Sequence, residues 1–311
     1  GAQRDGEVSG GESDAQRRIA EEVIRSMSEA VTVTGLDFLF SSINPAFTRM
    51  TGYQEAEIVG RPSSILNCEQ HSDEFHSALR NTLQRTGHWS GEIWQRRKDG
   101  EEFLCWLELS EVTDREGNRT HWVGVLTDIT DRKRAEQELR YLANYDTLTG
   151  LPNRTLLGER LAHALIRARR HGSKVSVLFL DLDRFKHVND SMGHAAGDRL
   201  LKAAAARIQA NVRESDTVAR LGGDEFALVI ENLAKAEHAG LVARKLLDAV
   251  VLPVTIDEHE AMVTASLGVA LYPQDGSHGA ALLREADRAM YRAKAEGGNL
   301  CRFSSSCALP E

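Results

Sequence analysis

Acidic side chains follow an apolar run of this chain and recur beside a pair of glycines further along. The run 175–180 is apolar apart from one serine, which is typical of a buried central strand, and it leads directly into Asp181. Asp224 and Glu225 follow the two glycines. If the two segments are neighbouring strands, these carboxylates converge at a sheet edge of the kind where α/β proteins bind ligands. Converging carboxylates suit Mg²⁺ and phosphate chemistry, although single Asp and Gly residues are also the usual residues of a solvated turn.

The segments around these acids predict an α/β domain with a mixed sheet flanked by helices, because helical and extended patterns alternate through the second half of the chain. The predicted helices span 156–171, 198–212, 236–251 and 280–296, and the predicted strands span 175–180, 217–221, 226–230 and 261–271. Gly222 and Gly223 lie between two of these strands, where they predict a tight hairpin that lets a ligand approach the backbone closely.

The first half of the chain has a different pattern, which predicts an antiparallel sheet with helices inserted between its early and late strands. The extended runs are 31–34, 38–40, 89–96, 102–112 and 121–126. An Asp-Gly pair at 99–100 separates two of them and is a good hairpin signal. The chain is therefore predicted to have two domains, one α+β and one α/β.

A helix is predicted to connect the two halves. Thr130 can cap it, and Ala135, Leu139 and Leu142 fit part of a coiled-coil seam, although a connector helix in a monomer fits the same pattern. The predicted organisation begins with a disordered segment rich in Gly, Ser and Glu (1–13), followed by a first domain with an N-terminal helix (14–130). A connector helix (131–145), a second domain (146–306) and a tail (307–311) complete it.

Composition narrows the possible functions. The net charge of -8 provides no general field that would attract nucleic acid or an anionic membrane, so the charge of a nucleotide substrate must be met locally. The four cysteines lack zinc-type spacing and predict free thiols in a reducing compartment. Signal peptides and apolar runs of about 18 residues are both missing from the sequence. We therefore expect a cytoplasmic protein without a membrane segment in this chain, which could still be part of a longer protein.

The run Arg220 to Phe226, which contains Gly-Gly-Asp-Glu-Phe, resembles the signature of the GGDEF-domain diguanylate cyclases. Other segments of the chain resemble further motifs of that family and occur in the family's order, within 146–154, 181–198 and 286–294. The resemblance implies an enzyme that condenses two GTP into cyclic di-GMP and two pyrophosphates, by attack of a 3′-hydroxyl on an α-phosphorus. Each domain would hold one GTP, so the resemblance also implies a homodimer in which two domains face each other.

The same resemblance assigns a role to each acidic residue. Asp181, the carbonyl of Leu182 and Asp224 would hold Mg²⁺ (or Mn²⁺) on the triphosphate. Glu225 would be a further metal ligand or the base that helps to deprotonate the 3′-hydroxyl. Lys294 would neutralise the terminal phosphates. Catalysis would then consist mainly of positioning and charge neutralisation.

Substrate contacts are also implied by the resemblance. Backbone N–H groups at Arg184, Phe185 and Lys186 would bind the phosphates. The side chains of Asn189 and Asp198 would contact the guanine edge, and Gly222 and Gly223 would let the ligand approach the backbone closely. One position departs from the family pattern, because Gly298 stands where an arginine usually contacts the phosphates.

Arg213 and Asp216 lie before the glycine pair at the spacing of the family's product-inhibition motif. Arginine can grip a phosphate or a guanine edge bidentately, and aspartate accepts hydrogen bonds from guanine. An Arg and an Asp at this spacing are, on general grounds, more often an exposed ion pair. The family context favours an allosteric site for cyclic di-GMP, and hence product inhibition.

The region from about Val31 to Thr130 resembles a PAS domain, through motifs that include 44–47, 87–92, 97–100 and 128–130. The resemblance implies a sensor domain that often dimerises and often binds a small ligand in a central cavity. The ligand itself is unknown. A flavin photoadduct is not expected, because the required cysteine block is absent, and His71 and His76 are expected to be polar surface residues more often than haem ligands.

Three interpretations follow from the sequence. The first is an active, product-inhibited diguanylate cyclase under PAS control. The second is a catalytically weak GGDEF domain that acts as a receptor for cyclic di-GMP or GTP, which only Gly298 favours. The third is the regulatory half of a larger protein whose phosphodiesterase domain is not in these residues.

Overall fold

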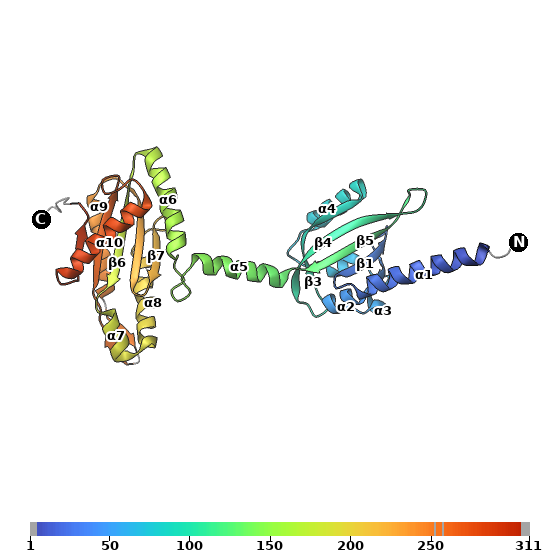
Figure 1. The fold of residues 1–311 in the computed structure, drawn as a ribbon, viewed down its shortest axis with the longest axis horizontal. Helices are drawn as coiled ribbons and strands as arrows, with labels where there is room; N and C mark the ends of the chain where they lie inside the picture. The colour runs from blue at the N-terminus through green and yellow to red at the C-terminus, as the bar shows by residue number, and fades with distance from the viewer. Residues whose placement is uncertain (1–4, 252, 257, 306–311) are drawn as a thin grey trace. The chain divides into compact units, whose positions relative to one another are not determined.

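The computed structural model describes residues 5–251, 253–256 and 258–305. The chain divides into two compact units between Gln137 and Glu138, inside one helix. The first unit is built on an antiparallel sheet and the second on a mixed sheet flanked by helices, which confirms the predicted fold class (Figure 1). The finer boundaries predicted at 130 and 146 stay a prediction.

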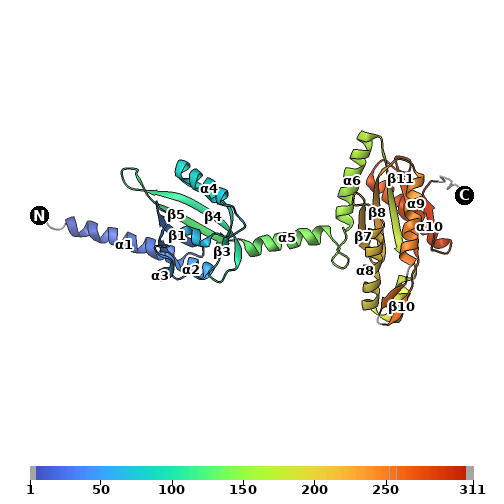
Figure 2. The same cartoon turned by 180° about the vertical axis from the view of Figure 1, so that it is seen from behind.

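The first unit has five strands in the order β2-β1-β5-β4-β3, with every neighbouring pair antiparallel. Its elements are α1 (Asp5–Ser26), β1 (Ala30–Gly35), β2 (Phe40–Ile43), α2 (Pro45–Thr51), α3 (Glu55–Ile58), the short 3₁₀ helix η1 (Ser63–Leu66), α4 (Asp73–Thr86), β3 (His88–Arg96), β4 (Glu102–Thr113) and β5 (Arg119–Asp128). The inserted helices α2 to α4 cover one face of this sheet, where the core residues Phe47, Phe103 and Leu126 are buried (Figure 2).

Helix caps define the inserted helices. The Asn44 side chain accepts a hydrogen bond from the N–H of Phe47 and starts α2, and Ser72 does the same for Phe75 at the start of α4. Gly52 and Gly87 end these two helices in the left-handed conformation, which glycine adopts without steric penalty. The polar turns noted in the sequence therefore mark the ends of helices as well as strands.

The second unit contains a five-stranded sheet in the order β12-β11-β6-β8-β7, in which only the β11–β12 pair is parallel. Its elements are α5 (Thr130–Asn144), which begins in the first unit, α6 (Arg154–His171), β6 (Lys174–Leu182), α7 (Phe185–Met192), α8 (His194–Ala210), β7 (Thr217–Gly222), β8 (Glu225–Leu233), α9 (Glu237–Val251), the small pair β9 (Val254–Ile256) and β10 (His259–Ala261), β11 (Ala265–Tyr272), α10 (Gly279–Ala295) and β12 (Cys301–Phe303).

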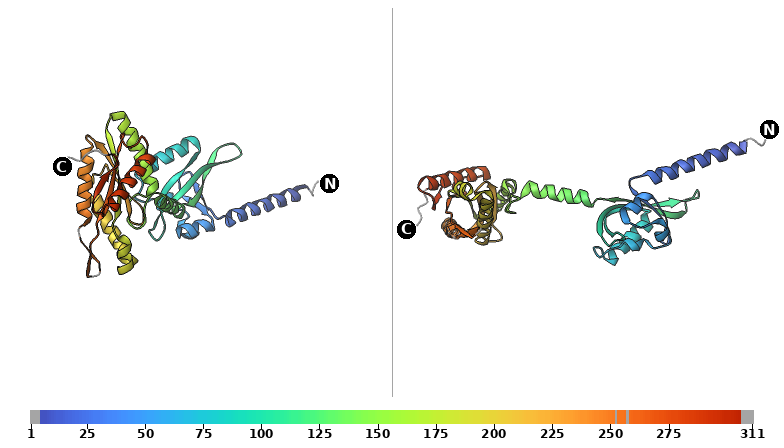
Figure 3. Two further views of the ribbon diagram at one scale, coloured as in Figure 1. Left: turned by 60° about the vertical axis from the view of Figure 1, so that its left-hand side comes forward. Right: turned by 90° about the horizontal axis from the view of Figure 1, so that it is seen from below.

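Helices cover both faces of this second sheet (Figure 3). Alternate residues of β6 explain the arrangement, because Leu178 and Leu180 pack with α8 and α9 while Val177 and Phe179 pack with α6 and α10. A strand that is buried on both faces must be apolar almost throughout, which is the pattern seen in the run 175–180. β6 is therefore the central strand, as predicted.

The disorder predicted for 1–13 stays a prediction; the described part of that segment, from Asp5 onward, is included in α1, and residues 1–4 lie outside the described residues. One predicted strand is wrong in detail. The strand expected at 261–271 is divided between β10 and β11. The tail at 307–311 also lies outside the described residues. Within the described ranges, no helix has the length and apolar character needed to cross a bilayer.

Candidate active site

The end of β6 brings together the two acidic segments that the sequence set apart. In the sheet register, Asp181 lies opposite Glu225 of β8 on one side and opposite Ser266 of β11 on the other. The N–H of Leu182 donates to the carbonyl of Asp224 over 3.3 Å. The predicted convergence of Asp181 and Asp224 therefore follows from the pairing of β6 with the β7–β8 hairpin, which turns at Gly222 and Gly223 with positive φ at both.

Asp181 shares its buried position with a second carboxylate and a lysine. Its Oδ1 accepts a hydrogen bond from Lys294 Nζ of α10 at 2.5 Å. Burial, together with the charge of Asp224 and a hydrogen bond with that side chain, raises the pKa of Asp181 to about 6 despite the lysine. Burial disfavours the charge on Lys294, but the hydrogen bond and charge of Asp181 outweigh it and raise the pKa of the amine. The cluster thus holds more negative charge than one lysine neutralises.

Glu225 lies beside this cluster. Burial, then the charges of Asp287 and Asp224, raise the pKa of its carboxyl, while Arg154 and Lys294 act in the opposite direction. A carboxylate with a raised pKa accepts a proton more readily than an ordinary one. Arg154 opens α6 and had no role in the sequence interpretation, so its influence on Glu225 is a finding of the structure.

The donor set at this strand end fits Mg²⁺. Asp181 and Asp224 offer carboxylate oxygens close enough to perturb one another, and the repulsion between them is the kind that a divalent cation relieves. Among the described residues, no three His, Cys, Asp or Glu side chains gather as a metal cluster on their own. Mg²⁺ typically takes one or two carboxylates from a protein and leaves its other positions to water and substrate phosphates, so Asp181 and Asp224 would be sufficient protein ligands.

Backbone N–H groups are presented at the start of α7, directly after β6. Arg184 adopts a left-handed conformation, with φ 56°, and α7 begins at the next residue, Phe185, whose side chain is buried. Lys186 is exposed. This turn is where the resemblance expects the phosphates, and the left-handed residue gives it the alternation of conformations that aims successive N–H groups into one concavity.

A buried polar atom without a partner marks the expected guanine subsite. Asn189 Oδ1 in α7 has no hydrogen-bond partner, although the atom is shielded from solvent. It lies against Gly197 of α8, where an added Cβ would be 1.9 Å away. Asp198 is the next residue along α8 and is exposed. The sequence named Asn189 and Asp198 as guanine contacts but gave no role to Gly197, whose missing side chain makes room for Asn189.

Asp183 forms a network that the sequence interpretation missed. Its Oδ2 accepts hydrogen bonds from Thr264 Oγ1 at 2.6 Å and from the N–H of Asn299 at 2.9 Å, and its Oδ1 accepts from Ser266 Oγ at 2.7 Å. Gly298 packs against this carboxylate, with φ 77° and room for a Cβ only at 2.8 Å from Asp183 Oδ2. A side chain at 298 would therefore meet both backbone strain and a carboxylate fixed by three donors.

A second missed contact joins the hairpin to the start of the unit. Arg220 Nη1 forms a 2.8 Å ion pair with Asp146, and its Nε donates to the carbonyl of Gly223 at 2.9 Å. Asp146 also accepts hydrogen bonds from the N–H and the hydroxyl of Thr149. Both residues belong to quoted motifs, so the signal was present in the sequence, but the pairing between them depends on the fold.

Arg213 and Asp216 do not form a side-chain ion pair with each other. Asp216 instead accepts hydrogen bonds from the N–H of Arg213 at 3.0 Å and of Glu231 at 3.2 Å, which hold the turn before β7. Among the described residues, the exposed Arg213 guanidinium has no partner. No ion pair is therefore formed between these two described side chains, and a product site at Arg213 and Asp216 stays a prediction.

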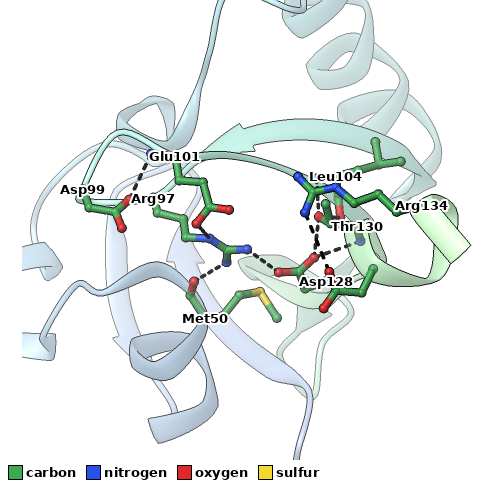
Figure 4. Close-up of polar contacts among 9 residues, drawn as sticks. Met50, Arg97, Asp99, Glu101, Leu104, Asp128, Thr130 and Arg134 are labelled. Carbon is green, nitrogen blue, oxygen red and sulfur yellow. Dashed lines mark hydrogen bonds and ion pairs between the residues drawn. The ribbon is translucent and has the colours of Figure 1, made fainter. Parts of the chain in front are cut away.

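The first unit ends in a network of polar contacts around Asp128 (Figure 4). Arg97 donates to the carbonyl of Met50 and pairs with Asp128 Oδ2 at 2.6 Å. Asp128 Oδ1 accepts from the hydroxyl of Thr130, which also accepts from the N–H of Leu104. The network ties the sheet to the first residue of α5, and it includes two residues of the motif at 128–130 through which this region resembles a PAS domain.

Comparison with known proteins agrees with this geometry. Residues 143–300 match the family described as diguanylate cyclase, GGDEF domain, and residues 20–129 match the PAS fold. The chain is 51% identical over 178 residues to the bifunctional diguanylate cyclase/cyclic di-GMP phosphodiesterase MucR of Pseudomonas aeruginosa, a match that covers 57% of this chain and 26% of MucR. The chain spans less than half the length of this and the other most similar curated relatives.

Solved structures match the second unit. The GGDEF domain of TpbB (YfiN) from Pseudomonas aeruginosa has a TM-score of 0.51 and 43% identity, over 52% of this chain and 94% of that one. The coiled coil and GGDEF domain of DgcB from Caulobacter crescentus, in complex with c-di-GMP, has a TM-score of 0.50 and 27% identity, over 56% of this chain and 92% of that one. With the matched motifs, the strand order and the acidic cluster in agreement, the chain belongs to the GGDEF-domain diguanylate cyclase family and carries a PAS domain ahead of its GGDEF domain.

Proposed function

We propose that this chain condenses two molecules of GTP into cyclic di-GMP with the help of Mg²⁺. The observation that carries the proposal is the cluster at the end of β6, where strand pairing brings Asp224 beside Asp181 and Lys294 adds one cation. Such a cluster suits a substrate that brings both phosphate oxygens and a divalent cation. The family membership and the c-di-GMP bound to DgcB support the same reaction.

Each residue of the cluster has a role in this proposal. A magnesium ion held by Asp181, the Leu182 carbonyl and Asp224 would supply charge neutralisation to the triphosphate. Glu225, with its raised pKa, takes the proton of the attacking 3′-hydroxyl or completes the metal site. When the substrate binds, Lys294 gives up its hydrogen bond to Asp181 and contacts phosphate oxygens instead.

Guanine selection is the second part of the proposal. Asn189 Oδ1 is shielded and unpartnered, so a hydrogen-bond donor of the base would satisfy it. Asp198, an exposed residue of α8, accepts from the two adjacent donors of guanine, which adenine cannot offer. The turn at Arg184, Phe185 and Lys186 receives the phosphates.

The reaction requires two such domains to face each other, so we propose a homodimer as the active species. Leu139 and Leu142 of α5 are 66% and 48% exposed and provide apolar surface on the connector helix. Turnover per molecule should therefore fall on dilution. A rate per molecule that is independent of concentration would count against the dimer.

Product analysis by chromatography tests the reaction. The purified chain with GTP and Mg²⁺ should form cyclic di-GMP, whereas Glu225→Ala should form none, and ATP in place of GTP should give no cyclic product. Asp248→Ala, which removes an exposed carboxylate of α9, is the matched control and should keep full turnover. Formation of product by the Glu225→Ala protein would remove Glu225 from the mechanism.

Product inhibition is the regulatory part of the proposal. The free guanidinium of Arg213 beside Asp216 supports a site for cyclic di-GMP. Arg213→Ala should relieve inhibition by added product, and Arg244→Ala on α9 is the control with an equivalent loss of charge. Inhibition that is unchanged in Arg213→Ala would place the product elsewhere.

A receptor function is the second candidate, and Gly298 is the observation that favours it. This residue supplies no cation to the phosphates, and its position against Asp183 leaves little room for one. A receptor would bind cyclic di-GMP in an Arg213-dependent manner but form no product from GTP, even after bound nucleotide is removed. Product formation by the parent chain would exclude this reading.

A further inference from the structure

A cavity of about 90 Å³ lies inside the first unit, between its sheet and α4. Most of its walls are apolar, with Leu79 and Leu83 from α4 and Leu107, Leu109 and Leu126 from the strands. Since about 10–15 Å³ of such space holds one water molecule, the cavity has room for roughly six water-sized groups. A haem or a flavin is therefore far too large for it.

Three residues that line this cavity each have a buried polar atom without a hydrogen-bond partner. The atoms are His76 Nε2 in α4, Gln95 Oε1 in β3 and Trp122 Nε1 in β5. The residues are only 8%, 7% and 2% exposed, so bulk solvent does not satisfy these atoms, and His76 is not the surface residue expected from the sequence. Buried polar groups are nearly always paired, and three unpaired ones around one cavity indicate an occupant that is polar where it meets them.

The charge of the lining narrows the occupant further. Arg80 is the lining residue that carries a charge, and neither Asp nor Glu is among the lining residues. Its guanidinium lies 5.9 Å from the ring of Phe38, which in turn stacks on Trp122, and it forms no ion pair within the described part of the chain. The Trp122 indole can only donate a hydrogen bond. Trp122 therefore contributes a buried donor without an acceptor, and the exposed Arg80 contributes the positive charge of the lining.

The other two unpartnered groups, on His76 and Gln95, can act as either hydrogen-bond donors or acceptors. The His76 imidazole donates or accepts at Nε2 according to its tautomer, and the Gln95 amide exchanges its acceptor for a donor on rotation. His76 and Arg80 lie four residues apart on α4 and both line the cavity, so the imidazole and the guanidinium share one face of the helix. Burial and the charges of His71 and Arg80 lower the pKa of His76, whereas the charge of Asp73 opposes them.

We propose that this cavity binds a short monocarboxylate. Its carboxylate accepts hydrogen bonds from Trp122 and Arg80, and its chain, of about four to six non-hydrogen atoms in all, lies against the leucines. Ordered water molecules alone are the competing occupant, because a polar cavity of this size also holds several of them.

Nuclear magnetic resonance of the indole N–H groups tests this on the full chain. All four tryptophans are assigned by single replacement, and Trp122→Phe identifies the Nε1–H signal of interest. Titration uses butyrate, with butyramide as the neutral isostere and butylamine as the cation of similar length. We expect a saturable shift of the Trp122 signal with butyrate, and binding of the amide and the amine that is at least about tenfold weaker.

Arg80→Met is the decisive variant, because Arg80 is exposed and its loss leaves the core intact. Butyrate binding should weaken at least about tenfold in Arg80→Met and stay unchanged in Arg85→Met, an exposed arginine of the same helix that does not line the cavity. Equal binding of butyrate and butyramide, an Arg80→Met protein that binds as the parent does, or no saturable shift with any of the three compounds would overturn the proposal, the last in favour of water. This readout is confined to the first unit and does not depend on diguanylate cyclase activity.

Discussion

Lys294 Nζ lies 2.5 Å from Asp181 Oδ1, so helix α10 is joined through a charged hydrogen bond to the end of the central strand β6. Asp181 is 7% exposed and has Asp224 as a neighbour, so the lysine offsets only part of the negative charge at this strand end. A divalent cation would neutralise the remaining negative charge, and the triphosphate would then replace Asp181 as the partner of Lys294.

Lys294→Met should reduce cyclase turnover by roughly 10²–10³-fold, which is the loss typical when one preorganised charge-stabilising donor is removed. GTP binding should weaken as well, because the carboxylates then repel the phosphates without an opposing ammonium. Steady-state kinetics with chromatographic detection of cyclic di-GMP measures both effects. Lys245→Met, an exposed lysine of α9, is the control, and equal turnover in the two variants would contradict the role of Lys294.

Gly197→Ala should weaken the discrimination between GTP and inosine triphosphate. The added methyl group would lie 1.9 Å from Asn189 Oδ1, so the amide must leave the position in which its oxygen awaits a donor. We expect the preference for GTP in kcat/KM to fall by roughly tenfold, the range of a lost neutral hydrogen bond. Gly158→Ala tests the general effect of alanine in a helix, because no atom lies within 4 Å of the Cβ it would add to α6.

Gly298→Ala should destabilise the second unit by about 1–3 kcal/mol, through left-handed backbone strain and the contact with Asp183. Gly172→Ala separates the two causes, since Gly172 has a similar φ of 66° and open space around it, and it should lose less. Denaturant unfolding followed by far-ultraviolet circular dichroism gives the free energies. Equal losses of unfolding free energy in the two variants would show that the Asp183 side chain moves aside at no cost. Gly298→Arg would then supply the arginine usual in the family without strain beyond that of the backbone.

Protonation of a buried histidine should destabilise the first unit in acid. Burial and the charges of His71 and Arg80 lower the pKa of His76, and Asp73 opposes them only weakly; burial also lowers the pKa of His71. A depressed pKa means that the native state prefers the neutral ring, so this stability is present above the unfolded value of about 6.5 and is lost as the pH falls below it.

Tryptophan fluorescence measures this effect selectively, because Trp89, Trp94, Trp106 and Trp122 all lie in the first unit. The denaturant concentration at the unfolding midpoint should begin to fall as the pH drops below about 6.5. The fall should be shallower in His76→Gln and unchanged in His121→Gln, which replaces an exposed histidine of β5. An identical pH profile in His76→Gln would assign the acid sensitivity to other groups.

Motif spacing was sufficient to predict the mixed sheet and the meeting of Asp181 with Asp224, because a buried strand and a Gly-Gly hairpin are local features that leave few alternatives. The network of Asp183 was not predictable, since Thr264, Ser266 and Asn299 reach it only through strand register and the turn after α10. Likewise, periodicity placed Trp122 in a strand but could not show that its indole N–H lacks a partner. Such relationships depend on three-dimensional packing and not on residue type.

Arg97→Met should destabilise the first unit by about 1–3 kcal/mol, because it removes the guanidinium that pairs with the Asp128 carboxylate and donates a hydrogen bond to the Met50 carbonyl. Arg97→Lys should recover only part of the loss, since one ammonium cannot reproduce the directions in which the guanidinium contacts Met50, Glu101 and Asp128. Tryptophan fluorescence during denaturant unfolding reports the change. Lys98→Met removes the neighbouring exposed pair with Glu57 and should have little effect. If both substitutions cost the same, the network around Asp128 would be a surface feature, and it could not tie α5 to the sheet.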